Sequence, residues 1–219
     1  MFCKEILIRN IPVLKPGDSG LHAAALMDDL KLKHLPVIKE GIYIYLLSER
    51  DVNDMKNPEA EIENTCFYAP YVWEESSIPE ALQIMSKDSL TLLPVLANSG
   101  EYAGAITLPV LIEGLSELSN TGSEGALIAV EPNQPEFVLS QIIRLIEDNR
   151  AKVLSLFSYR NKETDRPVLL FKIDLEDAFP VIRSLERFNY PVKYYRQKQV
   201  LPDEILRKRV DELLHYIEL

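Results

Sequence analysis

Hydrophobic positions in the first half of the chain follow two alternating patterns. Apolar residues at helical spacing occupy Leu21, Ala24, Ala25, Met27 and Leu30, and two apolar runs, Leu35–Ile38 and Ile42–Leu47, follow with Gly41 between them. The first pattern predicts an amphipathic helix with Ser19 as its N-cap, and two apolar runs around a glycine turn predict a pair of strands. Ile11 and Val13 mark a further strand before the helix, and a second helix is expected from about Glu49 to Lys56.

The same pattern returns in the next stretch of the chain. It has a helix containing Ile78 and Met85, strands at Leu92–Ala97 and Glu101–Thr107, and a helix at about Pro109–Leu118. One constant offset, called the repeat offset below, pairs identical residues in the two stretches: Pro12 and Pro70, Ser19 and Ser77, Ala23 and Ala81, Met27 and Met85, Leu35 and Leu93, Pro36 and Pro94, and Val37 and Val95. One extra residue in the turn then aligns Gly41 with Gly100 and Ser48 with Thr107. Residues 1–60 and 61–118 are therefore predicted to be tandem βαββα units that share one core, because so small a unit buries little surface alone.

The last third of the chain has a different pattern. The polar residues 119–125 predict a linker, and residues 126–196 predict strands and helices in the order βαββαβ, the ferredoxin-like arrangement. The expected strands are Ala126–Val130, Val153–Tyr159, Val168–Ile173 and Val192–Tyr195, and the expected helices lie near 138–149 and at about Asp177–Phe188. The predicted fold class of the whole chain is therefore α+β.

A helical tail is expected at 197–219. Pro202, Asp203 and Glu204 are helix-start signals. The apolar stripe that follows consists of Ile205, Leu206, Val210, Leu213, Leu214 and Ile217. This stripe could pack on the sheet of its own domain or on a second copy of the chain, and the pattern alone favours neither.

Composition excludes several classes of function. A net charge of −10 disfavours binding to nucleic acid, which requires clustered Lys and Arg. The two cysteines, Cys3 and Cys66, indicate a reducing, cytoplasmic compartment, and the longest apolar run is too short to cross a membrane. His22, His34 and His215 show no metal-binding spacing, and no catalytic motif occurs. We therefore expect a soluble cytoplasmic protein that is not an enzyme and holds no metal.

The duplicated units resemble a pair of cystathionine-β-synthase (CBS) domains, the Bateman module. The resemblance rests on the helix before Leu35-Pro36-Val37, the Gly41 hairpin, and Ser48-Glu49-Arg50-Asp51 at the end of a strand. Such pairs commonly bind AMP, ADP, ATP or S-adenosylmethionine in the cleft between the two units. The resemblance implies that Asp51 accepts hydrogen bonds from ribose hydroxyls and Ser48 contacts ribose or phosphate.

Further roles follow from the same resemblance. Arg50 or His34 would face phosphate, while Leu35 and Pro36 would lie beside the base and Ile11 and Val13 would flank it. The second copy has Val110 where the first has Asp51, so at most one nucleotide site is expected. Tyr45 stands where the family usually keeps glycine, and its bulk could narrow the cleft.

Residues 126–196 resemble an ACT domain, a small regulatory module that often binds amino acids. The resemblance implies Glu131 and Asn133 as loop residues near such a ligand, but glycine is missing before the helix. A loop without glycine gives a carboxylate poorer access to backbone N–H groups, which favours edge-strand pairing between two copies. A CBS pair followed by an ACT-like domain is similar to the acetoin-utilisation B-type regulatory proteins.

Two readings of the Ser48–Asp51 pair remain open at this stage. The pair could cap the helix that begins at Glu49, since Ser at the N-cap and an acidic residue three positions later suit helix starts. It could instead bind ribose. The corresponding functions are a regulatory protein that senses an adenine nucleotide, and an oligomerisation or docking scaffold whose cleft is empty. A homodimer is expected with either function.

Overall fold

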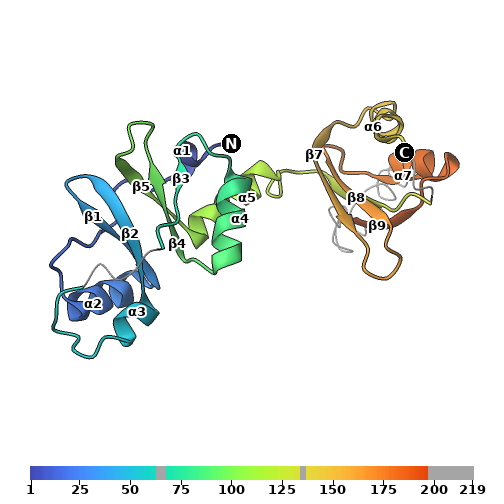
Figure 1. Cartoon of the computed structure of the whole chain (residues 1–219). Helices are drawn as coiled ribbons and strands as arrows, with labels where there is room; N and C mark the ends of the chain where they lie inside the picture. The colour runs from blue at the N-terminus through green and yellow to red at the C-terminus, as the bar shows by residue number, and fades with distance from the viewer. Residues whose placement is uncertain (63–67, 134–136, 197–219) are drawn as a thin grey trace, which may run out of the picture. The chain divides into compact units, whose positions relative to one another are not determined.

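The computed structural model describes residues 1–62, 68–133 and 137–196. These residues form two compact units, the first spanning Met1–Leu118 and the second beginning at Ser119 (Figure 1). Both contain helices and antiparallel strands, which confirms the α+β class. Within the described ranges, no helix has the length and apolar character needed to cross a membrane.

The first repeat contains α2 (Gly20–Leu30), β1 (His34–Lys39), β2 (Ile42–Ser48) and α3 (Glu49–Asn53). Helix α2 begins where the Ser19 hydroxyl accepts the N–H of His22 at 3.2 Å, as its N-cap position predicts. The helix ends at Leu30, and the residue that follows it, Lys31, has a left-handed φ of 55°. Strands β1 and β2 pair antiparallel, and the ladder shifts register between Val37 and Ile38.

The second repeat reproduces these details. It contains β3 (Val72–Trp73), α4 (Ile78–Asp88), β4 (Leu92–Leu96), β5 (Tyr102–Thr107) and α5 (Leu108–Leu118). The left-handed residue after α4 is Ser89, at φ 54°, and the register shift falls between Val95 and Leu96. Both features match those of the first repeat at the repeat offset. The backbone therefore carries the duplication that the sequence predicts.

The strand predicted around Ile11 and Val13 is reduced to a single bridge. Leu14 pairs in parallel with Val37, whereas in the second repeat β3 pairs in parallel with β4 through Val72 and Val95. These two pairs correspond at the repeat offset. Pro16 has no N–H to donate, whereas its counterpart Glu74 donates to the carbonyl of Leu96 at 2.9 Å, so the ladder is shorter in the first repeat.

The N-terminal segment, residues 1–9, packs on the second repeat, which the sequence pattern did not predict. The N–H of Cys3, in the short helix α1 (Cys3–Ile6), donates to the carbonyl of Ser76 at 2.8 Å. Ile8 and Ala105 exchange two backbone hydrogen bonds of 2.8 and 3.0 Å. In the reverse direction, the N–H of Ile62 donates to Asp18 of the first repeat at 2.8 Å. Each repeat is thus completed by a segment that lies outside its own stretch of sequence.

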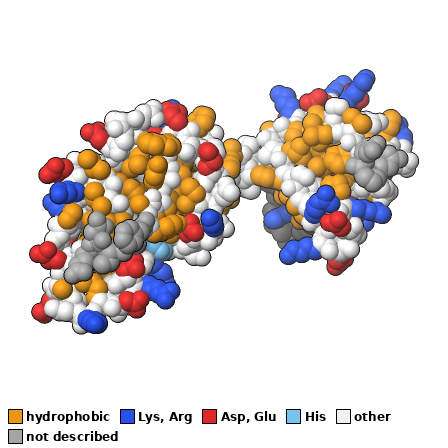
Figure 2. Space-filling model, viewed as in Figure 1, with side chains coloured by type: hydrophobic (Ala, Val, Ile, Leu, Met, Phe, Trp, Pro, Cys, Tyr) orange, Lys and Arg blue, Asp and Glu red, His pale blue; other side chains and the backbone are white. Residues whose placement is uncertain are grey.

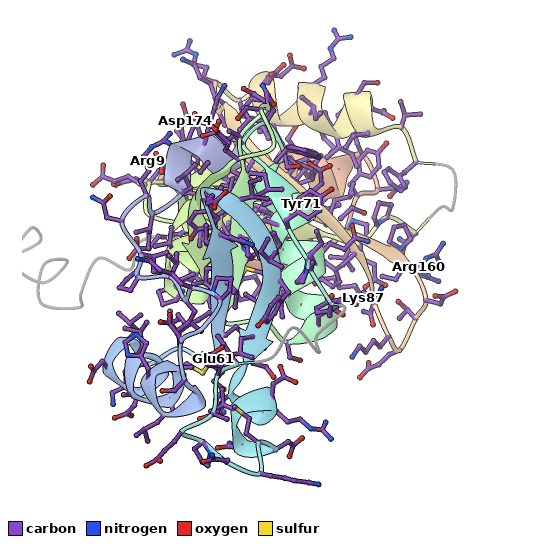
Figure 3. All side chains as sticks on the ribbon, turned by 60° about the vertical axis from the view of Figure 1, so that its left-hand side comes forward. Arg9, Glu61, Tyr71, Lys87, Arg160 and Asp174 are labelled. Atoms are coloured by element: carbon purple, nitrogen blue, oxygen red, sulfur yellow. The ribbon has the colours of Figure 1, made fainter. Side chains whose placement is uncertain are left out.

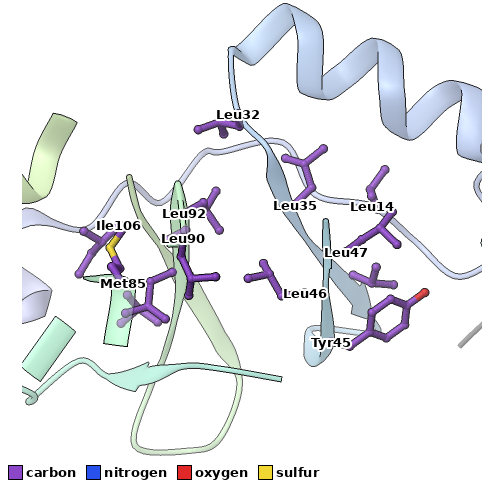
Figure 4. Packing of buried hydrophobic residues seen from close by; sticks show 14 of the residues in the cluster. Leu14, Leu32, Leu35, Tyr45, Leu46, Leu47, Met85, Leu90, Leu92 and Ile106 are labelled. Atoms are coloured by element: carbon purple, nitrogen blue, oxygen red, sulfur yellow. The ribbon is translucent and has the colours of Figure 1, made fainter. Parts of the chain in front are cut away.

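The two repeats share one hydrophobic core, as predicted. In Figure 4, Leu14, Leu35, Leu47 and Tyr45 lie at the first repeat and Met85, Leu90, Leu92 and Ile106 at the second, with Leu46 between the two groups. Met27 and Met85 are both buried core residues. Because the core is continuous, the pair of repeats forms one unit.

The second unit contains β6 (Ala126–Val130), α6 (Leu139–Glu147), β7 (Val153–Arg160), β8 (Pro167–Ile173), α7 (Phe179–Arg187) and β9 (Val192–Arg196). The strands form an antiparallel sheet in the order β7-β8-β6-β9. The predicted βαββαβ order is therefore confirmed and is consistent with an ACT-like fold. Both helices pack on one face of this sheet, around the fully buried Phe171.

Residues 119–125, predicted to be a linker, are hydrogen-bonded to the second unit. The ammonium of Lys172 donates to the carbonyls of Ser123 and Gly125 at 2.8 and 3.3 Å. The Asn120 amide donates to the carbonyl of Leu154 at 3.1 Å. The helical tail predicted at 197–219 lies outside the described residues.

Candidate functional site

Ser48 and Asp51 form the helix cap that their spacing predicts. Asp51 Oδ2 accepts the backbone N–H of Ser48 at 2.9 Å and the Ser48 hydroxyl at 2.6 Å. The Ser48 oxygen in turn accepts the N–H of Asp51 at 3.2 Å. The same kind of box holds the start of α4, where Glu80 accepts from the N–H and the hydroxyl of Ser77. Capping therefore accounts for this part of the geometry without a ligand.

The second carboxylate oxygen of Asp51 is not used by the cap. Oδ1 has no hydrogen-bond partner among the residues that the structure describes. Asp51 lies on a cavity of about 500 Å³ that Glu61, labelled in Figure 3, also lines. The described residues that line this cavity are Leu47, Asp51, Asp54, Met55, Lys56, Asn57, Ala60, Glu61 and Ile62. One side chain can therefore cap α3 and still present an acceptor to a ligand.

The charges around this cavity are mainly acidic. Asp51, Asp54 and Glu61 contribute three carboxylates to the described lining, and Lys56 contributes the one cation. Like charges disfavour one another in a partly enclosed space, so a ligand with several phosphates is repelled here. A ligand with little negative charge, or with a positive group, fits the lining better.

His34 connects the two repeats. Its Nδ1 accepts the backbone N–H of Thr91 at 3.2 Å and lies 3.1 Å from the Thr91 hydroxyl. Burial lowers the pKa of His34, and the nearby Asp51 and Glu49 carboxylates oppose that shift. An Nδ1 that accepts an N–H carries no proton, so the geometry favours the neutral ring over a phosphate-binding cation.

The other predicted site residues do not gather around the cavity beside Asp51. Arg50 is exposed on α3 and lies 3.7 Å from Asp54, while Leu35 and Pro36 are buried in β1. Ile11 packs on the shared core. Val13 lines a different cavity of about 450 Å³, near Ile38 and Gly41. Among the eight residues predicted for the adenine nucleotide, Asp51 alone lines the larger, acidic cavity.

Residues of the second repeat lie beside β2, and sequence reasoning missed them. The N–H of Leu46 donates to the carbonyl of Tyr68 at 3.4 Å, and the Tyr43 hydroxyl donates to the carbonyl of Pro70 at 3.1 Å. Pro70 is the counterpart of Pro12 at the repeat offset. The repeat therefore contained a signal for this contact, because Pro70 stands in the second copy where Pro12 stands in the first, and it is Pro70 that bonds to β2.

Tyr45 is a core residue. Its side chain is 3% exposed, and its backbone position pairs with Val37. Its counterpart, Gly104, has a φ of +149°, and a Cβ there would lie 2.5 Å from the carbonyl oxygen of Ile8. The space beside this strand position is therefore occupied differently in the two repeats. In the first repeat the Tyr45 ring occupies it, and in the second repeat the N-terminal segment lies against Gly104.

Glu131 and Asn133 hold the hairpin loop between β7 and β8. Glu131 is 1% exposed and accepts hydrogen bonds from the Asn161 amide and the Thr164 hydroxyl, both at 3.0 Å. The bond from Asn161 is the main cause that lowers the pKa of Glu131. Arg166 donates to Asn133 at 3.2 Å. These contacts give both residues a structural role in the second unit.

Metal chemistry receives no support from the described part of the chain. No group of three or more His, Cys, Asp or Glu residues there is placed to hold a metal ion. Cys3 is buried, and burial raises the pKa of its thiol to about 11, so the thiol stays protonated at neutral pH.

Comparison with known proteins identifies the duplicated part. The family of CBS domains matches residues 3–55 and 67–117. An inosine-5'-monophosphate dehydrogenase from Korarchaeum cryptofilum is 30% identical over 105 residues, and one from Thermoplasma acidophilum is 26% identical over 109 residues. These matches cover 48% and 50% of this chain, and the chain spans 22% of the length of each relative.

Solved structures resemble the same part of the chain. A CBS domain pair/ACT domain protein from Thermotoga maritima is 21% identical with a TM-score of 0.49, covering 53% of this chain and 98% of that one. CBSX2 in complex with AMP is 17% identical with a TM-score of 0.43, covering 53% and 96%. The cytosolic domain of the Mg²⁺ channel MgtE in complex with ATP is 17% identical with a TM-score of 0.41, covering 50% and 46%.

Proposed function

Because residues 3–117 are a tandem pair of CBS domains, we propose that this chain is a non-catalytic regulatory protein that binds one adenine nucleotide beside Asp51. CBS homologues bind AMP and ATP in solved structures. The observation that carries the proposal is the unused oxygen of Asp51 on a cavity of about 500 Å³. Ligand pockets typically have volumes of about 300–1,000 Å³.

The lining predicts which adenine ligand binds best. Three carboxylates and one ammonium disfavour the triphosphate of ATP. S-adenosylmethionine carries a sulfonium and an amino group, and AMP carries a single phosphate. We therefore expect S-adenosylmethionine and AMP to bind more tightly than ATP, with Asp51 Oδ1 accepting from the ribose hydroxyls.

Regulation would act through the two repeats. A ligand shifts a conformational equilibrium only as far as it binds one state better than the other. Asp51 follows β2, whose neighbours Tyr68 and Pro70 belong to the second repeat. A ligand beside Asp51 would contact the end of β2 and the segment that follows it, and its effect would reach the second repeat through the hydrogen bonds of β2 to Tyr68 and Pro70.

Thermal unfolding with AMP, ADP, ATP and S-adenosylmethionine tests this proposal. A ligand at a hundred times its Kd stabilises the folded state by about 2.7 kcal/mol, which raises Tm by several degrees. The Asp51→Asn variant keeps an acceptor for the cap but loses the charged acceptor, worth about 1.5–3 kcal/mol, so affinity should fall about 10- to 100-fold. The matched Asp29→Asn variant, at an exposed position of α2 that does not line this cavity, serves as the control and should bind normally.

Two results would contradict the proposal. One is the absence of a Tm shift with all four ligands. The other is an equal shift in the parent and the Asp51→Asn variant, which would place the ligand elsewhere. A larger shift with ATP than with AMP would leave the site in place but refute the argument from acidic lining.

A second candidate function is a homodimeric scaffold. Leu108 and Ile112, one turn apart on α5, are 41% and 57% exposed. Exposed apolar residues that share a helix face often mark a protein contact. If this face forms a dimer, Ile112→Glu should give a monomer in light scattering, while the adjacent polar substitution Glu113→Gln should leave the dimer intact. A monomeric parent protein would exclude the scaffold.

A further inference from the structure

Lys172 is a buried cation that bonds to neutral groups. It lies on β8 between Phe171 and Ile173, which are fully buried in the core shared with α6 and α7, so its side chain leaves the opposite face of the sheet. Lysine is rarely buried unless its charge is paired, yet Lys172 is 6% exposed. Its ammonium donates to the carbonyls of Ser123 and Gly125 and forms no ion pair with a described carboxylate.

These two bonds do not require a positive charge. A neutral amide could also donate to both carbonyls and hold residues 121–125 beside the sheet. Taking an ammonium out of water is costly unless an opposite charge compensates it. An ammonium also carries three N–H donors, so one donor of Lys172 remains after the bonds to Ser123 and Gly125. Among the described residues, therefore, Lys172 has a charge and a donor left over, and both suit an anion.

A second cation, Arg196, lines the same cavity as Lys172, which has a volume of about 1140 Å³. The strand registers place both residues in one row across the sheet, on either side of Leu127. Neighbouring strands lie about 4.8 Å apart, so the Cα atoms of Lys172 and Arg196 are about 10 Å apart. Both side chains are long enough to contact one group that lies over Leu127. The row therefore offers two cations to the same space.

The rest of the described lining supplies a third donor and aromatic surface. The N–H of Gly122 donates to no described residue, and a Cβ added at Gly122 would meet no atom within 4 Å, so a ligand can approach this backbone closely. Tyr194 and Tyr195, 53% and 42% exposed, line the same cavity. Glu124 is the one carboxylate among the described lining residues. The cavity can thus hold an anionic group together with a small ring.

Charge distinguishes this cavity from the one beside Asp51. Three carboxylates and one ammonium belong to the described lining beside Asp51, whereas two cations and one carboxylate belong to the described lining here. Lys and Arg nearly balance Asp and Glu over residues 119–219, so the net charge of −10 belongs almost wholly to residues 1–118. Basic side chains are visible around the second unit in Figure 2. Because opposite charges attract, an anion that the cavity beside Asp51 repels is drawn to this one.

We propose that the second unit binds a small phosphate monoester between Lys172 and Arg196. The guanidinium of Arg196 then donates two N–H groups to phosphate oxygens, and Lys172 donates its remaining N–H. A phosphate monoester has three free oxygens and a charge of about −1.5 to −2 at pH 7, so it matches three donor groups and two cations better than a carboxylate does. Its organic group lies beside the tyrosines of β9. This site is independent of the nucleotide site proposed beside Asp51.

An NMR titration of the ¹⁵N-labelled full-length protein with phenyl phosphate tests the proposal. Benzoate, which carries the same ring on a carboxylate, and inorganic phosphate, which has no ring, serve as comparison ligands. Arg196→Gln removes a cation from an exposed position, and Lys172→Gln keeps N–H donors for the two carbonyls but removes the charge. Arg183→Gln, at an exposed position of α7 outside this cavity, is the matched control.

We expect phenyl phosphate to shift the amide signals of residues 121–125 and 194–196. Its Kd should rise at least about tenfold in Arg196→Gln and in Lys172→Gln, the ratio for a loss of about 1.4 kcal/mol of binding free energy. Arg183→Gln and Asp51→Asn should bind phenyl phosphate as the parent protein does. Inorganic phosphate should shift the same signals with a higher Kd, because it has no ring to contact the tyrosines.

Signals of residues 121–125 that do not move with phenyl phosphate would overturn the proposal. An equal Kd in the parent and in Arg196→Gln would also overturn it, because the phosphate would then lie elsewhere. Since Arg196 is exposed, this comparison holds even if Lys172→Gln fails to fold. A lower Kd for benzoate than for phenyl phosphate would refute the choice of a phosphate over a carboxylate.

Discussion

Replacing Gly104 by alanine tests whether the N-terminal segment completes the second repeat. Gly104 has a φ of +149°, and a Cβ there would lie 2.5 Å from the Ile8 carbonyl oxygen and 2.6 Å from Leu7 Cδ1. The Ile8 carbonyl also accepts the N–H of Ala105 at 3.0 Å. Because the closest atom is backbone, rotation of a side chain cannot relieve the clash. The segment carrying Leu7 and Ile8 must move.

The size of the effect follows from these contacts. Strained backbone at such a φ costs about 1–3 kcal/mol, and each of the two Ile8–Ala105 hydrogen bonds contributes about 0.5–1.5 kcal/mol. Loss of both bonds together with the strain should destabilise the first unit by about 2–6 kcal/mol. Gly100→Ala is the matched control: its φ is +87°, but no atom lies within 4 Å of an added Cβ. There we expect about 1–2 kcal/mol from the left-handed backbone alone.

Urea unfolding followed by tryptophan fluorescence measures both variants. Trp73 is the single tryptophan of the chain and lies in β3, so its signal reports the first unit. The Gly104→Ala midpoint should fall clearly below that of Gly100→Ala, with little change in slope. Equal midpoints for the two variants would refute the contact between residues 7–8 and Gly104, and with it the exchange of segments between repeats.

Three further predictions concern buried groups. Burial lowers the pKa of the His34 imidazole, so this ring binds a proton more readily in the unfolded chain than in the folded one. The free energy of unfolding of the first unit should therefore fall as pH drops from 6.5 through the pKa of His34 in the folded protein. The urea midpoint of the parent protein should therefore decrease as pH falls across this range. The His34→Gln variant should lose this pH dependence, and a variant of the exposed His22 should keep it. Phe171→Ala should destabilise the second unit by about 3–5 kcal/mol, seen as faster amide exchange in β6 and β8, while the Trp73 transition stays unchanged. The hydrogen bond from Asn161 lowers the pKa of the Glu131 carboxyl. Ionised Glu131 therefore contributes to the stability of the second unit above pH 4.5, the ordinary pKa of a glutamate, and this contribution is lost as pH falls through the pKa of Glu131 in the folded protein. Glu131→Gln should therefore flatten that pH dependence and speed exchange in the loop 161–166; exchange equal to the parent would contradict the role of Glu131 as its anchor.

The sequence predicted the features that depend on local patterns. Strands, helices and the repeat follow from apolar spacing and from pairs such as Leu35 and Leu93, and the α2 and α3 caps follow from Ser19 and Ser48. The strands, helices and caps involve residues within a few positions of each other, and the repeat shows as identical residues at one constant offset. The types of side chain along the sequence determine these features, so one sequence is enough to predict them.

The composition of the candidate site depended on contacts that leave little trace in the sequence. Thr91 donates its backbone N–H to His34, and Pro70 offers its backbone carbonyl to Tyr43, and neither group is specific to a residue type beyond the missing N–H of proline. The resemblance to CBS domains placed Ile11 and Val13 with Asp51, whereas the structure puts Val13 at another cavity. Long-range register decides which segments meet, and apolar spacing does not encode it.

The pairing of Ile8 with Ala105 also has a consequence for how the protein is made. The two residues are about a hundred positions apart, so at ribosomal rates the partner of Ile8 is synthesised about 5–20 s later. During that interval Ile6 and Leu7 have no second repeat to pack against, and the first repeat can close only after Ile62 has been made. The order of synthesis thus delays completion of either repeat, and the apolar N-terminus is the part of the nascent chain that a chaperone would need to shield.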